Sequence, residues 1–203
     1  MPAICITGGV GTGKSSFCHC LRELLPAAKF FDADEAAHQL VDLADVREAI
    51  RREFGSETFS AAGDLNRAAL RAIIFRDAAK KRALEQILHP RIRREWRAEA
   101  EKHRNSPDFF FADIPLLYET GGETLCDRAV VVACSPILQL QRLRERADID
   151  PEVAEQMIAA QMPLAEKIKC ADHVVWNDGP KQMLHEQGEL LVNLWRTQTW
   201  TKA

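Results

Sequence analysis

Four residues near the start of the chain stand at the spacing of a phosphate-binding loop, G-x-x-x-x-G-K-[ST]. They are Gly8, Gly13, Lys14 and Ser15. An apolar run over residues 3–7 predicts a strand before them, and apolar residues at helical spacing predict a helix after them. This order of strand, glycine loop and helix favours a nucleotide site over the alternative, a glycine-rich turn beside an unrelated lysine.

The residue types of this loop suit the charge of a nucleotide. Glycines adopt positive φ and carry no Cβ, so successive backbone N–H groups can point at phosphate oxygens. The start of the following helix adds donors and partial positive charge. Lys14 supplies a mobile charge for the β- and γ-phosphates, and the Ser15 hydroxyl is a ligand for Mg²⁺. We expect nucleotide contacts from seven residues of the loop: Gly9, Gly11, Thr12, Gly13, Lys14, Ser15 and Ser16.

Two carboxylates stand at the end of the second predicted strand, residues 29–32. In an open α/β sheet, the carboxyl ends of the strands face the ligand. A carboxylate there can accept the proton of an attacking hydroxyl or orient that hydroxyl. The alternative is a helix N-cap, for which Asp is well suited. One of Asp32 and Asp34 can cap while the other acts, and we favour Asp34 for the chemistry.

A third carboxylate ends the phenylalanine-rich strand predicted over 108–112. Asp113 resembles the second acidic element of enzymes with this loop, where Asp holds Mg²⁺ directly or through water. Strand-end aspartates are common, so the position alone is a weak signal. Residues 115–119 follow and should lie at the same edge of the sheet.

Two arginines lie four residues apart on a predicted helix and therefore share a face. A helical flap carrying Arg142 and Arg146 could close over phosphates, neutralise developing charge and exclude water. Glu145 supports the alternative, a solvated face. His89, with Pro90 between two predicted helices, is interpreted as structural when taken alone.

The predicted elements alternate between strand and helix. Strands are predicted at five places: 3–7, 29–32, 108–112, 128–133 and 173–176. Helices are predicted between and after them: 13–25, 34–43, 45–54, 66–75, 77–88, 90–104, 136–147, 151–162, 163–170 and a last one opened by Pro180. This order predicts an α/β fold with an open parallel sheet and helices on both faces. The helical run 34–104 is too long for one crossover and predicts an inserted subdomain.

Bulk properties bound the class of protein. The chain has 203 residues, of which 46% are apolar and 28% charged, and its net charge is −3. Neither a basic surplus nor a clear basic stripe supports nucleic-acid binding, because glutamates interleave with the arginines of 91–97. The start lacks the regions of a signal peptide, and the first apolar run is too short to span a membrane. We therefore expect a cytoplasmic protein.

The six cysteines, at positions 5, 18, 20, 126, 134 and 170, show no C-x-x-C spacing. Cys18 and Cys20 point to roughly opposite sides of a helix, so they cannot share a metal. We expect free, buried thiols in a reducing compartment. The histidines show no metal-ligand spacing either.

Beyond these single residues, the sequence resembles the dephospho-coenzyme A kinase family over most of its length. Short blocks in order carry the resemblance: 7–15, Asp32-Ala33-Asp34 with His38, Asn66-Arg67-Ala68-Ala69-Leu70 with Ile74-Phe75, 88–92, 115–119, Arg142 and Arg146, Gln161, Glu166-Lys167, Ala171-Asp172, Asn177 and Gly179. Ser16 departs from a usual Thr and Phe31 from a usual aliphatic residue. The series of blocks is more specific than the loop alone.

The resemblance implies that ATP donates its γ-phosphoryl group to the ribose 3′-hydroxyl of dephospho-coenzyme A, giving coenzyme A and ADP. It implies one domain, 1–203, with the phosphate-loop nucleoside triphosphate hydrolase fold. The core covers about 1–33, 105–137 and 168–203, a helical coenzyme-A-binding insert about 34–104, and a helical lid about 138–167. The implied cofactors are ATP and Mg²⁺, and we expect a monomer that needs no protein partner.

The resemblance also implies roles for single residues. Asp34 is the base or orienter for the 3′-hydroxyl, and Lys14 and the loop amides hold ATP. Arg142 and Arg146 close on the phosphates, and Ser15 and Asp113 hold the metal. Contacts with the acceptor are expected from four residues: His89, Arg93, Leu116 and Glu119.

Three other classes compete with this interpretation. A nucleoside monophosphate or shikimate kinase shares the loop and the lid but does not explain the blocks at 32–34, 89–90 and 115–119. A GTPase-type regulator needs an Asn-Lys-x-Asp block, which the sequence lacks. Lys14, Ser15 and Asp34 together speak against a binding module without catalysis.

Overall fold

The computed structural model describes residues 2–60, 63–147 and 149–198, apart from the side chains of residues 146 and 147. The chain divides into two compact units. The first unit comprises Met1–Phe31 and Glu99–Ala203, and the second comprises Asp32–Ala98.

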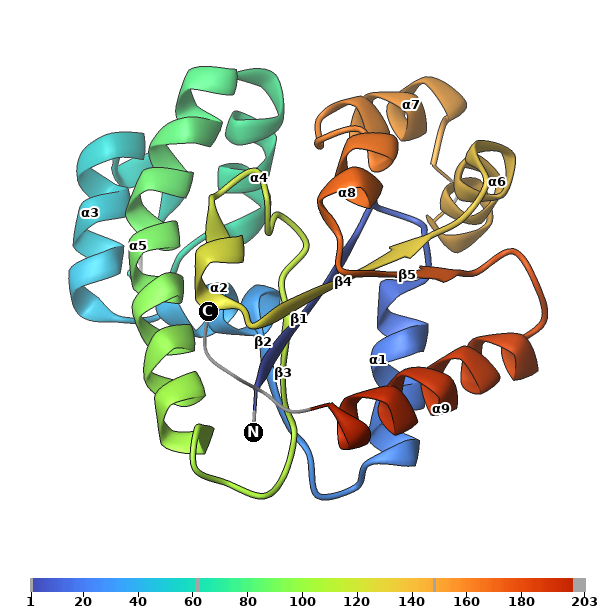
Figure 1. The fold of residues 1–203 in the computed structure, drawn as a ribbon. Helices are drawn as coiled ribbons and strands as arrows, with labels where there is room; N and C mark the ends of the chain where they lie inside the picture. The colour runs from blue at the N-terminus through green and yellow to red at the C-terminus, as the bar shows by residue number, and fades with distance from the viewer. Residues whose placement is uncertain (1, 61–62, 148, 199–203) are drawn as a thin grey trace. The chain divides into compact units, whose positions relative to one another are not determined.

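The first unit is built on one five-stranded sheet with the strand order β2-β3-β1-β4-β5 (Figure 1). The strands are β1 Ala3–Gly8, β2 Lys29–Asp32, β3 Phe110–Asp113, β4 Arg128–Ala133 and β5 His173–Trp176. β1 pairs in parallel with β3 and with β4, and β4 pairs in parallel with β5. The predicted open parallel sheet is therefore confirmed, and β1 stands at its centre with the glycine loop at its carboxyl end.

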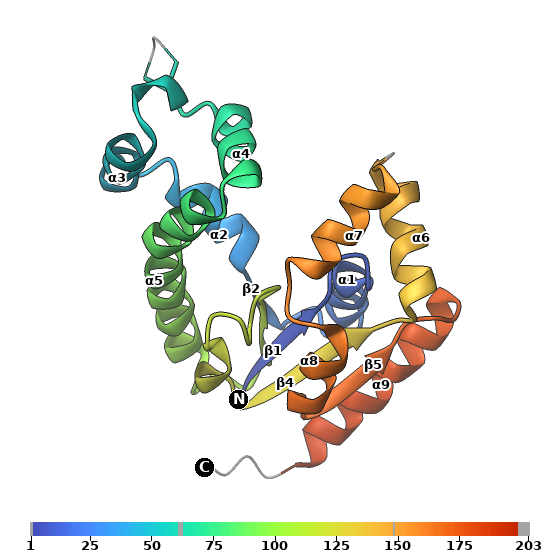
Figure 2. The same cartoon turned by 90° about the horizontal axis from the view of Figure 1, so that it is seen from above.

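Helices cover both faces of this sheet. Ile4 and Ile6 of β1 lie in a core with Phe17 of α1, Lys14–Leu24, and with Trp195 of α9, Lys181–Thr197. Side chains alternate along a strand, so Cys5 and Thr7 face the other way. On that side α8, Leu164–Cys170, lies beside β4 (Figure 2). Two further helices of this unit, α6 Pro136–Ala147 and α7 Pro151–Ala159, contact each other.

The second unit is helical and has its own core. Its helices are α2 Ala33–Leu40, α3 Ala44–Phe54, η1 Ser56–Thr58, α4 Arg67–Arg76 and the larger part of α5, Ala78–His103. Val46, Ile50 and Phe54 recur at helical spacing on α3 and are buried with Val41 and Leu70. The Asn66 side chain caps α4 by accepting the Ala69 N–H at 3.0 Å.

The two helices predicted over 77–88 and 90–104 are one helix. α5 runs without a break through Pro90. A proline inside a helix removes one backbone donor and favours a kink, and this is why the sequence suggested a boundary there. Pro90 is exposed, so the carbonyl that loses its partner is at the helix surface, where water can bond to it. His89 therefore lies within a helix and not between two.

The expectation of six free, buried thiols is wrong for three cysteines. Cys5 and Cys126 form a disulfide although 121 residues separate them, and Cys170 is exposed. The pairing depends on β1 and the chain entering β4 lying side by side, which spacing along the sequence cannot reveal. Cys18, Cys20 and Cys134 are free and buried, as predicted.

Within the described ranges, none of the helices has the length and hydrophobicity that crossing a membrane requires.

Candidate active site

The phosphate loop turns sharply between β1 and α1. Gly11 and Gly13 have φ angles of 78° and 89°, in the region that glycine adopts without strain. The backbone N–H of Thr12 donates to Gly9 O at 3.2 Å, and the Thr12 hydroxyl donates to the same carbonyl at 2.8 Å. A Cβ at Gly13 would stand 2.1 Å from Asn177 Nδ2. Both the backbone angle and the space therefore require glycine at position 13.

Two glutamine side chains hold one residue of the loop, Val10. Gln139 Nε2 donates to the carbonyl of Val10 at 2.7 Å, and the Val10 N–H donates to Gln161 Oε1 at 2.8 Å. Asn177 Nδ2 donates to the Thr12 carbonyl at 2.9 Å. Side chains from three distant segments thus fix the loop, and its shape does not depend on the glycines alone.

Arg142 of α6 lies against the same loop. Its guanidinium donates to the Thr12 carbonyl at 3.3 Å and to the Asn177 carbonyl at 2.9 Å. The predicted arginine is therefore placed at the phosphate loop within the first unit. The side chain of Arg146 lies outside the described residues.

Lys14 contacts a buried carboxylate from the neighbouring strand. Its ammonium group bonds Oδ1 of Asp113, and the Cys18 thiol donates to Oδ2 of the same carboxylate at 3.3 Å. The side chains of Lys14 and Asp113 are 14% and 7% exposed. Burial and the Asp113 charge raise the pKa of the Cys18 thiol, which therefore stays protonated and acts as a donor. Ser15 follows Lys14 and is exposed; that Ser15 and Asp113 hold the metal stays a prediction.

Glu119, an exposed residue, forms an ion pair with a buried lysine. Its carboxylate lies 2.9 Å from Nζ of Lys167, whose side chain is completely buried. Lys167 also donates to the carbonyl of Pro115 at 2.8 Å, and Glu119 accepts the Met162 N–H at 2.9 Å. The ammonium and the backbone donor hold the segment after β3 against α8. Leu116 is half-buried in that segment. The contacts of Leu116 and Glu119 with the phosphoryl acceptor, dephospho-coenzyme A, stay a prediction.

In the second unit, the two aspartates after β2 have different surroundings. Oδ1 of Asp32 accepts the N–H groups of Asp34 and Glu35 at 2.9 and 3.1 Å, so Asp32 is the N-cap of α2. The Asp34 side chain is exposed in the first turn of that helix. The cap is thus assigned to Asp32, and the chemical role of Asp34 stays a prediction.

His89 and Arg93 lie four residues apart on α5 and share a face of that helix. Both are half-buried. Burial lowers the pKa of His89, and the Arg93 charge lowers it further while Glu85 opposes the shift. A neutral imidazole beside a guanidinium can bind a phosphate or a hydroxyl group.

Some residues that shape the site gave no signal by spacing. Gln139 reaches Val10 across 129 positions, and no motif includes it. Gln161 and Asn177 appeared only as parts of the family resemblance, and their contacts with the loop could not be read from the sequence. Cys18 stands one helical turn after Lys14, so its place near the same carboxylate follows from helix geometry once α1 is known.

A glycine loop with its lysine beside a strand-end aspartate, on a parallel sheet, defines a phosphate-loop kinase fold. Two solved structures share it. The shikimate kinase from Acinetobacter baumannii superposes with a TM-score of 0.57 at 14% identity and covers 99% of this chain and 96% of its own. The dephospho-CoA kinase from Campylobacter jejuni gives 0.71 at 24% identity, over 94% and 95%. Both likenesses show the fold alone.

The sequence identifies the family within this fold. The model of the dephospho-CoA kinase family matches residues 2–183. A dephospho-CoA kinase from Symbiobacterium thermophilum is 40% identical over 191 residues, which are 93% of this chain and 79% of that protein. The chain therefore belongs to the dephospho-CoA kinase family and is an ATP-dependent kinase.

Proposed function

We propose that this protein phosphorylates the ribose 3′-hydroxyl of dephospho-coenzyme A with ATP, giving coenzyme A and ADP, the last step of coenzyme A synthesis. The observation that carries this proposal is the family match over residues 2–183, in a chain whose phosphate loop has its lysine and strand-end aspartate in contact. Kinases of the shikimate type share the fold at 14% identity, and the family match does not favour them.

In the proposed reaction, the phosphate loop and Lys14 bind the β- and γ-phosphates. Lys14 contacts Asp113 in the structure. When ATP binds, the ammonium group must either contact the phosphate oxygens and Asp113 together or leave Asp113 for the phosphate oxygens. Gln139, Gln161 and Asn177 keep the loop amides in place while this happens. Catalysis by such a loop rests on positioning and on charge stabilisation of the transferred group.

We assign the acceptor side to Asp34, which would orient the 3′-hydroxyl or accept its proton. His89, Arg93, Leu116 and Glu119 are proposed to contact dephospho-coenzyme A. The capping role of Asp32 supports this assignment. Because the Asp32 carboxylate already caps α2, Asp34 is not needed as the cap.

We propose Ser15 and Asp113 as the residues that hold Mg²⁺. The donor set fits: one carboxylate and one hydroxyl are what Mg²⁺ takes from a protein when phosphates and water complete its shell. In the described part of the chain, no group of three His, Cys, Asp or Glu residues forms a ready-made metal site, and that agrees with a metal bound together with its nucleotide. When bound, the ion neutralises phosphate charge.

We further propose that residues 34–104 form the coenzyme-A-binding insert and residues 138–167 the lid. Arg142, which donates to carbonyls of the loop and of Asn177, would turn toward the phosphates when ATP binds, and Arg146 would join it. Closure would keep water from competing with the acceptor. We propose a monomer that acts in the cytoplasm without a protein partner.

The test is ADP release from ATP and Mg²⁺ with a panel of acceptors: dephospho-coenzyme A, AMP, CMP, shikimate and none. We expect release that depends on dephospho-coenzyme A, with coenzyme A as the second product by mass spectrometry. Turnover with another acceptor would reject the substrate while keeping the kinase, and a lack of turnover with all of them would reject both.

A further inference from the structure

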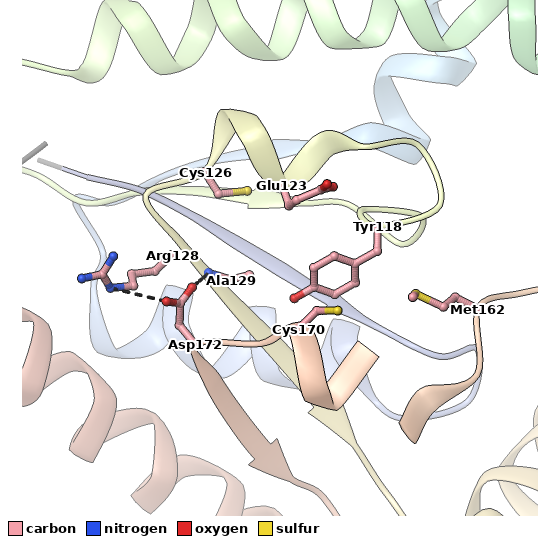
Figure 3. Close-up of a pocket in the computed structure, with 8 residues that line it drawn as sticks. All are labelled: Tyr118, Glu123, Cys126, Arg128, Ala129, Met162, Cys170 and Asp172. Atoms are coloured by element: carbon pink, nitrogen blue, oxygen red, sulfur yellow. Dashed lines mark hydrogen bonds and ion pairs between the residues drawn. The ribbon is translucent and has the colours of Figure 1, made fainter. Parts of the chain in front are cut away.

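A pocket of about 280 Å³ lies in the first unit, and apart from Met162 of the proposed lid its lining residues have no role assigned in the proposed kinase reaction (Figure 3). Cys126, Cys170 and Met162 bring three sulfur atoms to its wall. Tyr118 and the charged side chains of Glu123, Arg128 and Asp172 form the rest, with Ala129. The Tyr118 ring stands across the pocket from the short helix η2, Gly122–Leu125, and close to Cys170 (Figure 3).

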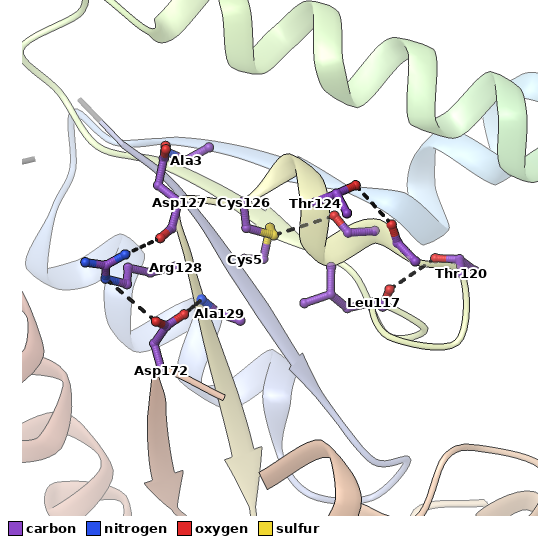
Figure 4. The surroundings of a disulfide bond; sticks show 12 residues. Ala3, Cys5, Leu117, Thr120, Thr124, Cys126, Asp127, Arg128, Ala129 and Asp172 are labelled. Atoms are coloured by element: carbon purple, nitrogen blue, oxygen red, sulfur yellow. Dashed lines mark hydrogen bonds and ion pairs between the residues drawn. A yellow bond between two sulfur atoms is a disulfide. The ribbon is translucent and has the colours of Figure 1, made fainter. Parts of the chain in front are cut away.

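One sulfur of this wall belongs to the Cys5–Cys126 disulfide (Figure 4). The two halves of that bond differ in access. Cys5 lies in β1 and is 0% exposed, whereas Cys126 is half-buried and lines the pocket. A molecule that enters from solvent can therefore reach the sulfur of Cys126 and not that of Cys5.

The fold around the bond does not depend on the bond. The Asp127 N–H donates to the Ala3 carbonyl at 2.8 Å, and the Ala3 N–H donates to Asp127 Oδ2 at 2.7 Å. The β1–β4 register begins one residue later, with Ile4 opposite Arg128. These bonds keep the chain after Cys126 beside β1 whether or not the two sulfurs are joined, so the disulfide can open and close within the folded protein.

We propose that Cys126 is a site of reversible thiolation, attacked through this pocket by small thiols that lack an anionic arm. The thiolate sulfur forms a new S–S bond with Cys126 and the Cys5–Cys126 bond breaks. The Cys5 sulfur leaves with the electron pair and takes up a proton, because burial disfavours a thiolate. A second thiol then attacks the bound thiol's sulfur, releasing the external disulfide and the Cys126 thiolate, which takes up a proton.

The preference for the thiol's charge follows from the wall. Two carboxylates, Glu123 and Asp172, face one guanidinium, that of Arg128, whose Nε already lies 3.8 Å from Asp172 Oδ1. A cationic thiol is thus attracted and an anionic one repelled. With a net charge of about one at roughly 6 Å in water, we expect a rate difference of about tenfold between the two.

Cys170 gives the experiment its matched background. It is exposed and lines the same pocket, so it would also react with the probes, and it has no place in the proposed kinase machinery. In Cys170→Ser, the remaining free cysteines, Cys18, Cys20 and Cys134, are buried. Any thiol adduct on the folded variant then reports on the disulfide.

The first measurement is alkylation of this variant, purified without reductant and denatured, followed by peptide mass mapping. We expect Cys5 and Cys126 to remain unlabelled and joined. The folded variant is then treated with cysteamine, 2-mercaptoethanol or 2-mercaptoethanesulfonate, quenched with acid and mapped. We expect adducts on Cys126, a newly free Cys5, and rates per thiolate that fall by about tenfold from cysteamine to the sulfonate at low salt and converge at high salt.

Three outcomes would overturn the proposal. The first is full alkylation of Cys5 and Cys126 before any thiol is added. The second is an adduct on Cys5, or none on either residue, while the denatured protein reacts. The third is a rate that does not depend on the charge of the thiol. This result would show that the pocket does not select thiols without an anionic arm.

Discussion

Asp32 and Asp34 stand two residues apart and show how one helix turn separates a structural role from a chemical one. Asp32 accepts two backbone N–H groups of α2. We predict that Asp34→Asn keeps ATP binding and loses turnover by about 10²–10⁴-fold, because an amide cannot accept the hydroxyl proton. The measurement is kcat with dephospho-coenzyme A, alongside the ATP dissociation constant.

Asp32→Asn is the matched control for that variant. Asn caps a helix about as well as Asp, so its oxygen can accept the same two N–H groups and the free energy of unfolding should change little. We expect turnover close to the wild-type value. The reverse pattern, with Asp32→Asn inactive and Asp34→Asn active, would transfer the chemical role to Asp32.

Lys167 carries a buried charge, and its removal should destabilise the protein by more free energy than the intact ion pair contributes. The ammonium is fully buried and bonds the carbonyl of Pro115 and the carboxylate of Glu119. Lys167→Met leaves the carbonyl of Pro115 and the exposed carboxylate of Glu119 without that donor, so we predict a loss of about 1–3 kcal/mol in the free energy of unfolding. Urea denaturation measures this loss.

Lys169, two residues away on the same helix, provides the control. Its pair with Glu166 is 69% and 49% exposed at the two side chains, and exposed pairs contribute about 0–1 kcal/mol. Lys169→Met should therefore unfold at nearly the wild-type urea concentration. Equal losses in the two variants would show that burial of Lys167 does not have the energetic weight assigned to it.

At the scale of elements, β5 carries a histidine that makes stability depend on pH. Burial lowers the pKa of His173 below its ordinary value of 6.5, an effect that Asp172 opposes and Arg128 assists. The unfolded chain therefore binds more protons than the folded one just below pH 6.5. The contribution of neutral His173 to stability is fully present above pH 6.5. It is lost as the pH falls through the lower pKa that this histidine has in the folded state.

We predict that His173→Gln reduces this loss between about pH 7.5 and 5.5, the range in which histidine titrates. Thermal unfolding at a series of pH values measures it, with His19→Gln as the control, because that side chain is 63% exposed. His89, whose pKa is also lowered by burial, accounts for part of the remaining slope. An unchanged slope in His173→Gln would refute the assignment.

Elements were predictable where a local pattern determines them. Apolar runs and glycine spacing identified the strands and the phosphate loop, because a buried strand and a tight turn each restrict residue type along the chain. Pro90 misled the prediction of α5, since the same residue that usually ends a helix is tolerated on its surface. Contacts such as Gln139 with Val10 and Cys5 with Cys126 depend on which strands become neighbours, and single-sequence spacing carries no information on that choice.

At the scale of the whole molecule, the affinity for ATP adds to stability. A ligand that binds only the folded state stabilises it by about 2.7 kcal/mol when present at 100 times its dissociation constant. We predict that ATP with Mg²⁺ raises the melting temperature of the protein. Lys14→Met should abolish most of this rise. The rise is measured against the melting temperature of the same variant without ATP, because Asp113 lacks its Lys14 partner in both conditions. A full rise in the variant would argue against the role given to Lys14.

The tryptophans give this chain a built-in optical readout for each of its units. Trp195 is 0% exposed in the core of the first unit, and Trp96 is 2% exposed in the second. Trp176 is 46% exposed, and Trp200 lies outside the described residues. Replacing Trp176 and Trp200 by Phe leaves one shielded indole per unit, and removing either of those two isolates the other. Emission from such single-tryptophan chains would show whether the units melt together or one before the other.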